Sequence, residues 1–140
     1  MVEPERKPVE VVSADGRVSK AEFTLWEISP TNENMVRLVL STGDKVFTAD
    51  ADSYFDALIL IRHDLEEIGL RPKCVGASLN VYPSGMSRSM GTGDKAYRLT
   101  LGLQAKMRDL VDIFDVDPMR DPVSVADQEK FYDEWLNSLK

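Results

Sequence analysis

The sequence predicts an α+β domain in which a single layer of antiparallel sheet is packed by two helices. Several short segments alternate apolar and polar residues, which is typical of strands with one buried face. Two longer segments repeat apolar residues every three or four positions, as amphipathic helices do. The segments follow one another as strands, helix, β-hairpin and C-terminal helix, an order that favours an antiparallel sheet over alternating parallel units. Residues 9–140 are expected to form one domain.

The first predicted elements are a tail and an antiparallel meander. Residues 1–8 hold two prolines and four charged residues, and they are expected to form a flexible N-terminal tail. Asp15-Gly16 is a strong hairpin signal, and residues 29–34 contain the Pro, Asn and Ser residues of a second turn. The strands of the meander are expected at residues 9–12, 20–28, 36–40 and 45–49.

The clearest predicted element is a helix over residues 53–68. Its apolar residues recur at spacings of four and three: Tyr54, Leu58, Ile61, Leu65 and Ile68. Asp52 or Ser53 supplies the side-chain oxygen that caps a first turn, and Gly69 supplies the residue type that most often follows a last one. The start, the end and the period of this segment therefore agree.

A β-hairpin and a second helix are predicted after it. Residues 75–82 and 97–103 alternate apolar and polar side chains as two strands, joined by a long connection at 83–95. Residues 110–116 mix apolar residues with aspartates and fit either a strand or a helical turn. A capping-box-like start and an apolar stripe then predict a C-terminal helix within residues 124–139.

Composition limits the partners that the protein is expected to bind. The 140 residues include 24 acidic and 17 basic ones, a formal net charge of -7 that repels nucleic acids and anionic membranes. A basic partner suits this charge better. Cys74 is the only cysteine, so an intramolecular disulfide is impossible. No apolar run has the length of a signal peptide or a membrane span, and we expect a cytoplasmic protein.

The connection at residues 83–93 is longer than an ordinary hairpin turn and is the first candidate for a binding element. Its glycines and hydroxyls suit close approach to a polar partner, and its methionines are unusual in a solvated loop. The alternative is a solvated connector. The P-loop spacing is missing, so no nucleotide cofactor is expected. The candidate binding residues are Tyr82, Ser84, Met86, Arg88 and Met90.

A run of aspartates is the second candidate. An acidic patch for a basic partner and an inert exposed patch both explain it, and the pattern of a calcium-binding loop is missing, so no metal is expected. Asp121 ends the run. The candidate binding residues are Asp109, Asp112, Asp115 and Asp117.

No catalytic residue is predicted. His63 is the only histidine, and pairing with Glu67 one helical turn away explains it as a surface residue. A His63 and Cys74 dyad is compatible with the sequence, but a cysteine near a strand start is more often a small core residue.

One stretch carries a resemblance. Between residues 81 and 99 the sequence reads Val81-Tyr82-Pro83-Ser84-Gly85-Met86-Ser87-Arg88, then Met90-Gly91, Gly93 and Ala96-Tyr97-Arg98-Leu99. This resembles a signature of small uncharacterised bacterial proteins. The size, acidity and order of elements are similar to those of the immunity proteins of contact-dependent and polymorphic toxin systems, which block a toxin domain by binding it. No immunity motif matches residue by residue, so the resemblance assigns no residue a role.

Three functions are weighed on these grounds. The first is a protein-binding inhibitor, most concretely an immunity protein that occludes a basic toxin domain. The second is a small-ligand-binding domain or small enzyme whose loop closes over a molecule held by Arg88, Tyr82 and Ser84. The third is a structural or assembly subunit.

Overall fold

The computed structural model describes residues 3–85 and 92–140 and confirms the α+β class. The strands are β1 (Glu5–Ser13), β2 (Val18–Trp26), β3 (Val36–Thr42), β4 (Lys45–Ala51), β5 (Leu70–Pro72), β6 (Val81–Tyr82), β7 (Lys95–Arg98) and β8 (Leu110–Asp112). The helices described are α1 (Tyr54–Glu67) and α3 (Val125–Ser138), with 3-10 turns η1 (Val75–Ala77) and η2 (Met107–Asp109). Within the described ranges, no helix is long and apolar enough to cross a membrane.

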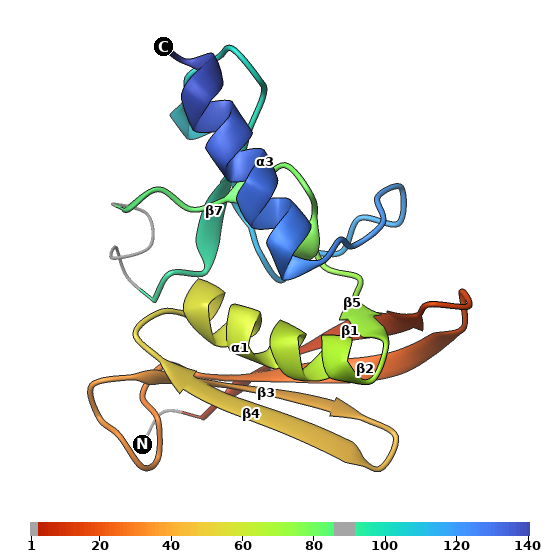
Figure 1. Cartoon of the computed structure of the whole chain (residues 1–140). Coiled ribbons are helices and arrows are strands. Elements are labelled where there is room, and N and C mark those ends of the chain that lie inside the picture. Colours follow the sequence, from red (N-terminus) through yellow and green to blue (C-terminus); the bar gives the residue numbers. More distant parts are fainter. Residues whose placement is uncertain (1–2, 86–91) are drawn as a thin grey trace.

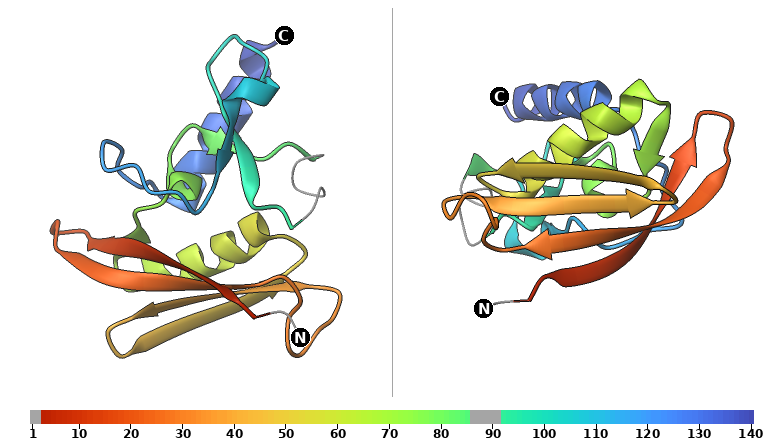
Figure 2. Two further views of the ribbon diagram at one scale, coloured as in Figure 1. Left: turned by 180° about the vertical axis from the view of Figure 1, so that it is seen from behind. Right: turned by 90° about the horizontal axis from the view of Figure 1, so that it is seen from below.

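The strands form two antiparallel sheets where the sequence indicated one. The larger sheet has the order β4-β3-β2-β1-β5, and the smaller has the order β6-β7-β8. Helix α1 lies over one face of the larger sheet, and α3 and the smaller sheet lie beyond it on the same side (Figure 1). Figure 2 shows the opposite face of the larger sheet with neither helix across it.

The N-terminal tail is shorter than predicted because β1 begins at Glu5, which lies opposite Leu25 of β2. Pro8 lies inside this strand. The Lys73 amide donates to the Glu10 carbonyl, so even-numbered residues of β1 direct their backbone groups towards β5. The paired residues of β5 end at Pro72, opposite Val11, so Pro8 lies beyond them at the sheet edge, where its missing N–H costs no ladder hydrogen bond.

Helix α1 covers the inner face of the larger sheet as its period predicted. Ser53 caps the helix by accepting from the Asp56 amide, and Gly69 follows its end at a φ of 75°. Four of the five predicted stripe residues are buried, whereas Ile68 is exposed. The buried stripe packs on the inward side chains of β1, β2 and β3, which include Val11, Phe23 and Leu38. Burying this face supplies most of the stability of such a helix.

The predicted strand at 75–82 is reduced to the two residues of β6. Residues 75–77 instead form η1, in which the Val75 and Gly76 amides donate to the Asp115 and Ile113 carbonyls. The backbone of Gly76 lies so close to Ile113 that a Cβ atom added to Gly76 would lie 2.8 Å from the Cβ atom of Ile113. The partner strand β7 is also short, because Gly102 turns the chain at a φ of 81° after Thr100.

The remaining elements close the fold. The ambiguous segment at 110–116 begins as strand β8, paired with β7. The predicted C-terminal helix is confirmed as α3, capped by Ser124, which accepts from the Asp127 amide. The amide of Val125 donates to the Glu66 carboxylate at 2.9 Å and thereby joins the start of α3 to α1.

Candidate functional site

The most distinctive polar site is a small cavity of about 70 Å³, here called the acidic pocket. Its lining residues are Glu3, Glu5, Leu25, Glu27, Tyr54, Thr92 and Asp94. They come from the N-terminal end of β1, the end of β2, the start of α1 and the segment before β7. These four segments meet at the left end of the molecule in Figure 1.

The sheet register accounts for the carboxylates on its floor. Odd-numbered residues of β1 and β2 face inward, as the burial of Val9 and Leu25 shows. Glu5 lies opposite Leu25, so it occupies an inner-face position at the end of the sheet. One more step of the period-two repeat places Glu3 and Glu27 on the same face. Acidic side chains therefore continue a row that is apolar farther along the sheet.

Tyr54 forms the opposite wall and is held from two sides. It is the first residue of α1, and its amide donates to the Thr92 carbonyl at 2.9 Å. Its ring packs edge-on against Phe114 at a centroid distance of 5.7 Å. The residue is only 2% exposed, and its hydroxyl has no hydrogen-bond partner among residues 3–85 and 92–140.

Burial and charge both act on the Tyr54 hydroxyl. Burial is the larger cause that raises its pKa above the ordinary tyrosine value. The nearby carboxylates of Glu27, Asp94 and Glu5 raise the pKa further, because they oppose a phenolate. The hydroxyl thus remains protonated in the neutral pH range, with a donor and an acceptor to offer a ligand.

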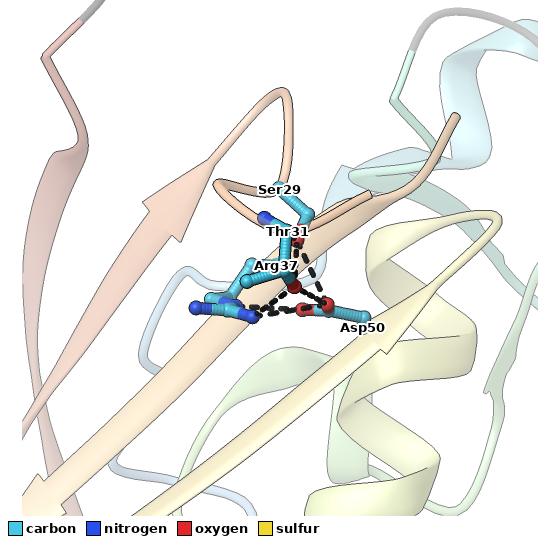
Figure 3. Close-up of polar contacts among 4 residues, drawn as sticks. All are labelled: Ser29, Thr31, Arg37 and Asp50. Carbon is cyan, nitrogen blue, oxygen red and sulfur yellow. Dashed lines mark hydrogen bonds and ion pairs between the residues drawn. The ribbon is translucent and has the colours of Figure 1, made fainter. Parts of the chain in front are cut away.

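The loop that follows Glu27 is fixed by a polar cluster on the sheet (Figure 3). Arg37 on β3 forms a bidentate pair with Asp50 on β4, with N···O distances of 2.7 and 3.1 Å. The Ser29 hydroxyl donates to Asp50 at 2.8 Å, and Arg37 also donates to Thr31 at 2.8 Å. Because Ser29 is buried, the chain just beyond Glu27 is held in one place.

The acidic pocket has little internal compensation for its charge. Glu5 has Lys7 as an ion-pair partner, at 4.0 Å. Glu3, Glu27 and Asp94 have no ion pair with any residue of the described ranges. Three carboxylates without an ion pair in the described ranges, beside a buried phenol, create a negative potential that a low-dielectric wall strengthens.

The loop predicted to bind a partner does contribute to the acidic pocket, but not through the candidate binding residues named from the sequence. Met86, Arg88 and Met90 lie outside the described residues. Tyr82 stacks on Tyr132 of α3 at 4.2 Å between ring centroids, so part of its ring serves packing. Ser84 is half-buried at the start of the loop. The far end of the connection supplies Thr92 and Asp94 to the pocket.

Three of the four predicted aspartates have local partners. Asp112 accepts from Lys7 and Lys95 at 3.4 and 3.2 Å. Asp109 accepts from the Lys106 amide at 2.9 Å in η2, and Asp117 pairs with Arg120 at 3.4 Å. Asp115 is exposed. Basic side chains therefore neutralise two of the four aspartates, Asp112 and Asp117. Burial raises the pKa of Asp112, but the Phe114 amide and Lys95 outweigh burial, and the net shift is downward.

His63 and Cys74 are placed as structural residues. His63 is exposed on α1. Cys74 is buried in the core, and burial raises the pKa of its thiol to about 11, so the thiolate needed for nucleophilic chemistry is scarce. Among the described residues, no group of three acidic, His or Cys side chains could hold a metal ion.

A second cavity, of about 440 Å³, lies along the edge of β1. Its lining residues are Pro8, Val9, Glu10, Lys20, Ala21, Lys73, Val116, Asp117 and Pro118. The floor is mainly apolar, and two lysines and two acids stand around it. This volume falls in the range of small-molecule sites. Of the loop residues that the structure describes, 82–85 and 92–95, none lines this cavity.

Comparison with known proteins adds no relative: the sequence matches no protein family and no curated protein.

The sequence contained a signal for part of the acidic pocket. Once β1 is extended to residue 5, its inner face reads Glu5, Lys7, Val9, and the last inward-facing residue of β2, Leu25, is followed two positions later by Glu27. Acidic residues on the buried phase of a strand indicate a site at the end of a sheet. The prolines and charges of residues 1–8, which are typical of a flexible tail, obscure this signal in the sequence.

Proposed function

We propose that the protein is a binding protein that occludes and inhibits a basic protein partner, as an immunity protein neutralises a toxin domain. The acidic pocket carries the proposal, because three of its carboxylates have no ion-pair partner among the described residues. The net charge of -7 supports it on the scale of the whole chain. Charges arranged in this way speed encounter with a basic surface and select against acidic ones.

The expected contact surface for the partner is the acidic pocket and not the aspartate run. The sequence predicts an acidic patch in the aspartate run, but Asp112 and Asp117 are already paired with basic residues. Glu27 and Asp94 are better placed to contact a partner, since neither has an ion-pair partner in the described ranges. Asp115 remains as an exposed carboxylate from the predicted run.

The test is neutralisation of a basic toxin domain encoded beside this protein. Co-expression is expected to restore growth of cells that produce the toxin. Glu27→Lys and Asp94→Lys reverse charge at the pocket, and each is expected to slow association about tenfold and abolish protection. Asp133→Lys is the matched control, because it reverses an exposed charge on α3 outside the pocket. Stopped-flow association at rising salt measures the electrostatic part.

The outcomes separate clearly. Protection that is lost with the pocket variants and kept with Asp133→Lys supports the proposal. If no neighbouring gene product is toxic, or if the three reversals act alike, the inhibitory role at this pocket is wrong.

A second function, small-molecule binding, is favoured by the cavity along β1. Its volume and apolar floor suit a small ligand with the lysines at the rim. Fragment screening by NMR is expected to shift the amides of Ala21 and Val116 together. A screen in which no fragment moves both amides would count against this function.

A further inference from the structure

We propose that the acidic pocket receives one lysine or arginine side chain of the protein partner, with the Tyr54 hydroxyl as a hydrogen-bonding wall. The inference rests on the proposed function and identifies the group on the partner that this site binds. It stands on three observations: the size of the cavity, the uncompensated carboxylates and the unpartnered buried hydroxyl.

The size of the cavity selects a small head group. One water molecule needs about 10–15 Å³ of a cavity volume of this kind, so a cavity of about 70 Å³ has room for a few waters or for one ammonium or guanidinium group. A nucleotide, a sugar or an aromatic side chain is too large. The apolar contact offered by Leu25 suits the methylene stem that carries such a head group.

The lining selects positive charge with N–H donors. Glu3, Glu27 and Asp94 are acceptors without ion-pair partners among the described residues. The hydroxyl of Tyr54 is buried and has no hydrogen-bond partner in those ranges, although buried hydroxyls are normally satisfied. An ammonium group offers three donors and a guanidinium five, so either one satisfies the phenol oxygen and two carboxylates together.

A resident metal ion fits less well. The described residues contain no group of three acidic, His or Cys side chains in positions to coordinate a metal. Organic cations need only hydrogen-bond distances to several acceptors, without a fixed coordination geometry. The fixed positions of Tyr54 and of the chain after Glu27 supply preorganisation, which reduces the entropy lost on binding.

The first experiment uses the full chain and small probes. n-Butylammonium represents lysine, ethylguanidinium represents arginine, spermidine represents a free polyamine, and tetramethylammonium has charge without N–H donors. NMR titration is expected to shift the Tyr54 ring and the Asp94 amide with the first two probes. Tetramethylammonium is expected to bind at least about tenfold more weakly, because a hydrogen bond from a charged group is worth about that factor.

Conservative variants test the roles of the individual groups. Tyr54→Phe and Asp94→Asn keep size and are each expected to weaken n-butylammonium binding about tenfold. Tyr97→Phe and Asp115→Asn are the matched controls, since neither residue lines the pocket. Circular dichroism checks folding, and Glu27→Gln replaces any variant that fails to fold.

The results separate this inference from the proposed function. Tight binding of spermidine with no response to the lysine and arginine probes, or binding of Ca²⁺ alone, overturns the inference. So do organic cations that shift no pocket residue. Once a partner is known, its inhibition can be measured with the same variants. If Glu27→Lys weakens inhibition but Tyr54→Phe and Asp94→Asn do not, the proposed function stands and the insertion of a partner side chain into the pocket is wrong. If the probes bind in the pocket but no partner is neutralised, the cation site stands and the proposed inhibitory function is wrong.

Discussion

Arg62 is the largest fully buried side chain in the described part of the protein, and it is held by neutral groups. Its guanidinium donates to the Gln128 side-chain oxygen at 2.6 Å and to the Val123 carbonyl at 2.9 Å. Burial lowers the pKa of Arg62, although the ordinary arginine value is high enough to keep it charged. Gln128 in turn donates to three backbone carbonyls. A buried charge without an ion-pair partner in the described ranges depends on every one of these dipoles.

Gln128→Leu is therefore expected to destabilise the fold by about 3 kcal/mol, because it leaves part of the Arg62 charge and several carbonyls unsatisfied. Urea unfolding measures the difference. Gln104→Leu is the control, since Gln104 is exposed, and it is expected to stay within about 0.5 kcal/mol of the wild type. The double variant Arg62→Met, Gln128→Leu is expected to lose less than the sum of its parts. Additive losses would show that the two side chains act independently.

At the scale of elements, the cross-strand pair of Arg37 and Asp50 joins β3, β4 and the loop after Glu27. The hydrogen bonds from Arg37 are the main cause that lowers the pKa of Asp50, and Ser29 adds to them against partial burial. A carboxyl whose folded pKa lies below its unfolded value stabilises the protein above the unfolded pKa. That contribution disappears as the pH falls through the folded pKa.

Asp50→Asn is accordingly expected to lower the free energy of unfolding by about 1 kcal/mol at pH 7. The difference from the wild type is expected to narrow as the pH falls below about 4, the unfolded value for aspartate. Urea unfolding at pH 7 and at pH 3 measures both. Asp44→Asn, at an exposed turn of the same hairpin, is the control and should show neither effect. A deficit that is the same at both pH values would mean that the hydrogen-bond geometry matters and the charge does not.

At the scale of the whole molecule, contacts between the two sheets run through a few tightly packed places. Gly76 lies against Leu58 of α1 and Ile113, which follows β8. Phe114 packs edge-on against Phe23 of β2 at 5.1 Å. Together with the Arg62 network, these contacts join the larger sheet and α1 to the smaller sheet and α3. We expect the two halves to unfold as one unit.

The two tryptophans test this expectation, because Trp26 lies in β2 and Trp135 in α3. Trp26→Phe and Trp135→Phe each leave one fluorescent reporter. Within each variant, the fluorescence midpoint in urea is expected to coincide with the midpoint measured by far-ultraviolet circular dichroism. Comparing two probes in the same variant removes the effect of the substitution on stability. A fluorescence transition that precedes the loss of ellipticity would show that the halves unfold separately.

The sequence predicted the elements whose pattern depends on local neighbours. Helix α1 shows its 3.6-residue period and both capping residues, and the meander shows alternation and the Asp15-Gly16 turn. The prediction of a strand over residues 75–82 was wrong, because the apolar residues in that alternating pattern lie in two different environments. Val75 and Ala77 face a packed core from a 3-10 turn, whereas Leu79 is exposed. Periodicity does not distinguish these cases from a strand.

The candidate site was likewise predictable from the sequence only in part. The sequence by itself determined the α+β class, the acidic charge and an unusual connection at 83–93, because composition and period need no knowledge of distant contacts. Only the tertiary structure decided that Asp112 is neutralised by lysines, and that Tyr54, Glu27 and Asp94 surround one cavity. Those residues come from three segments that meet when β1 pairs with β2 and α1 folds over the sheet. Their proximity depends on long-range packing, which the local sequence around each residue does not encode.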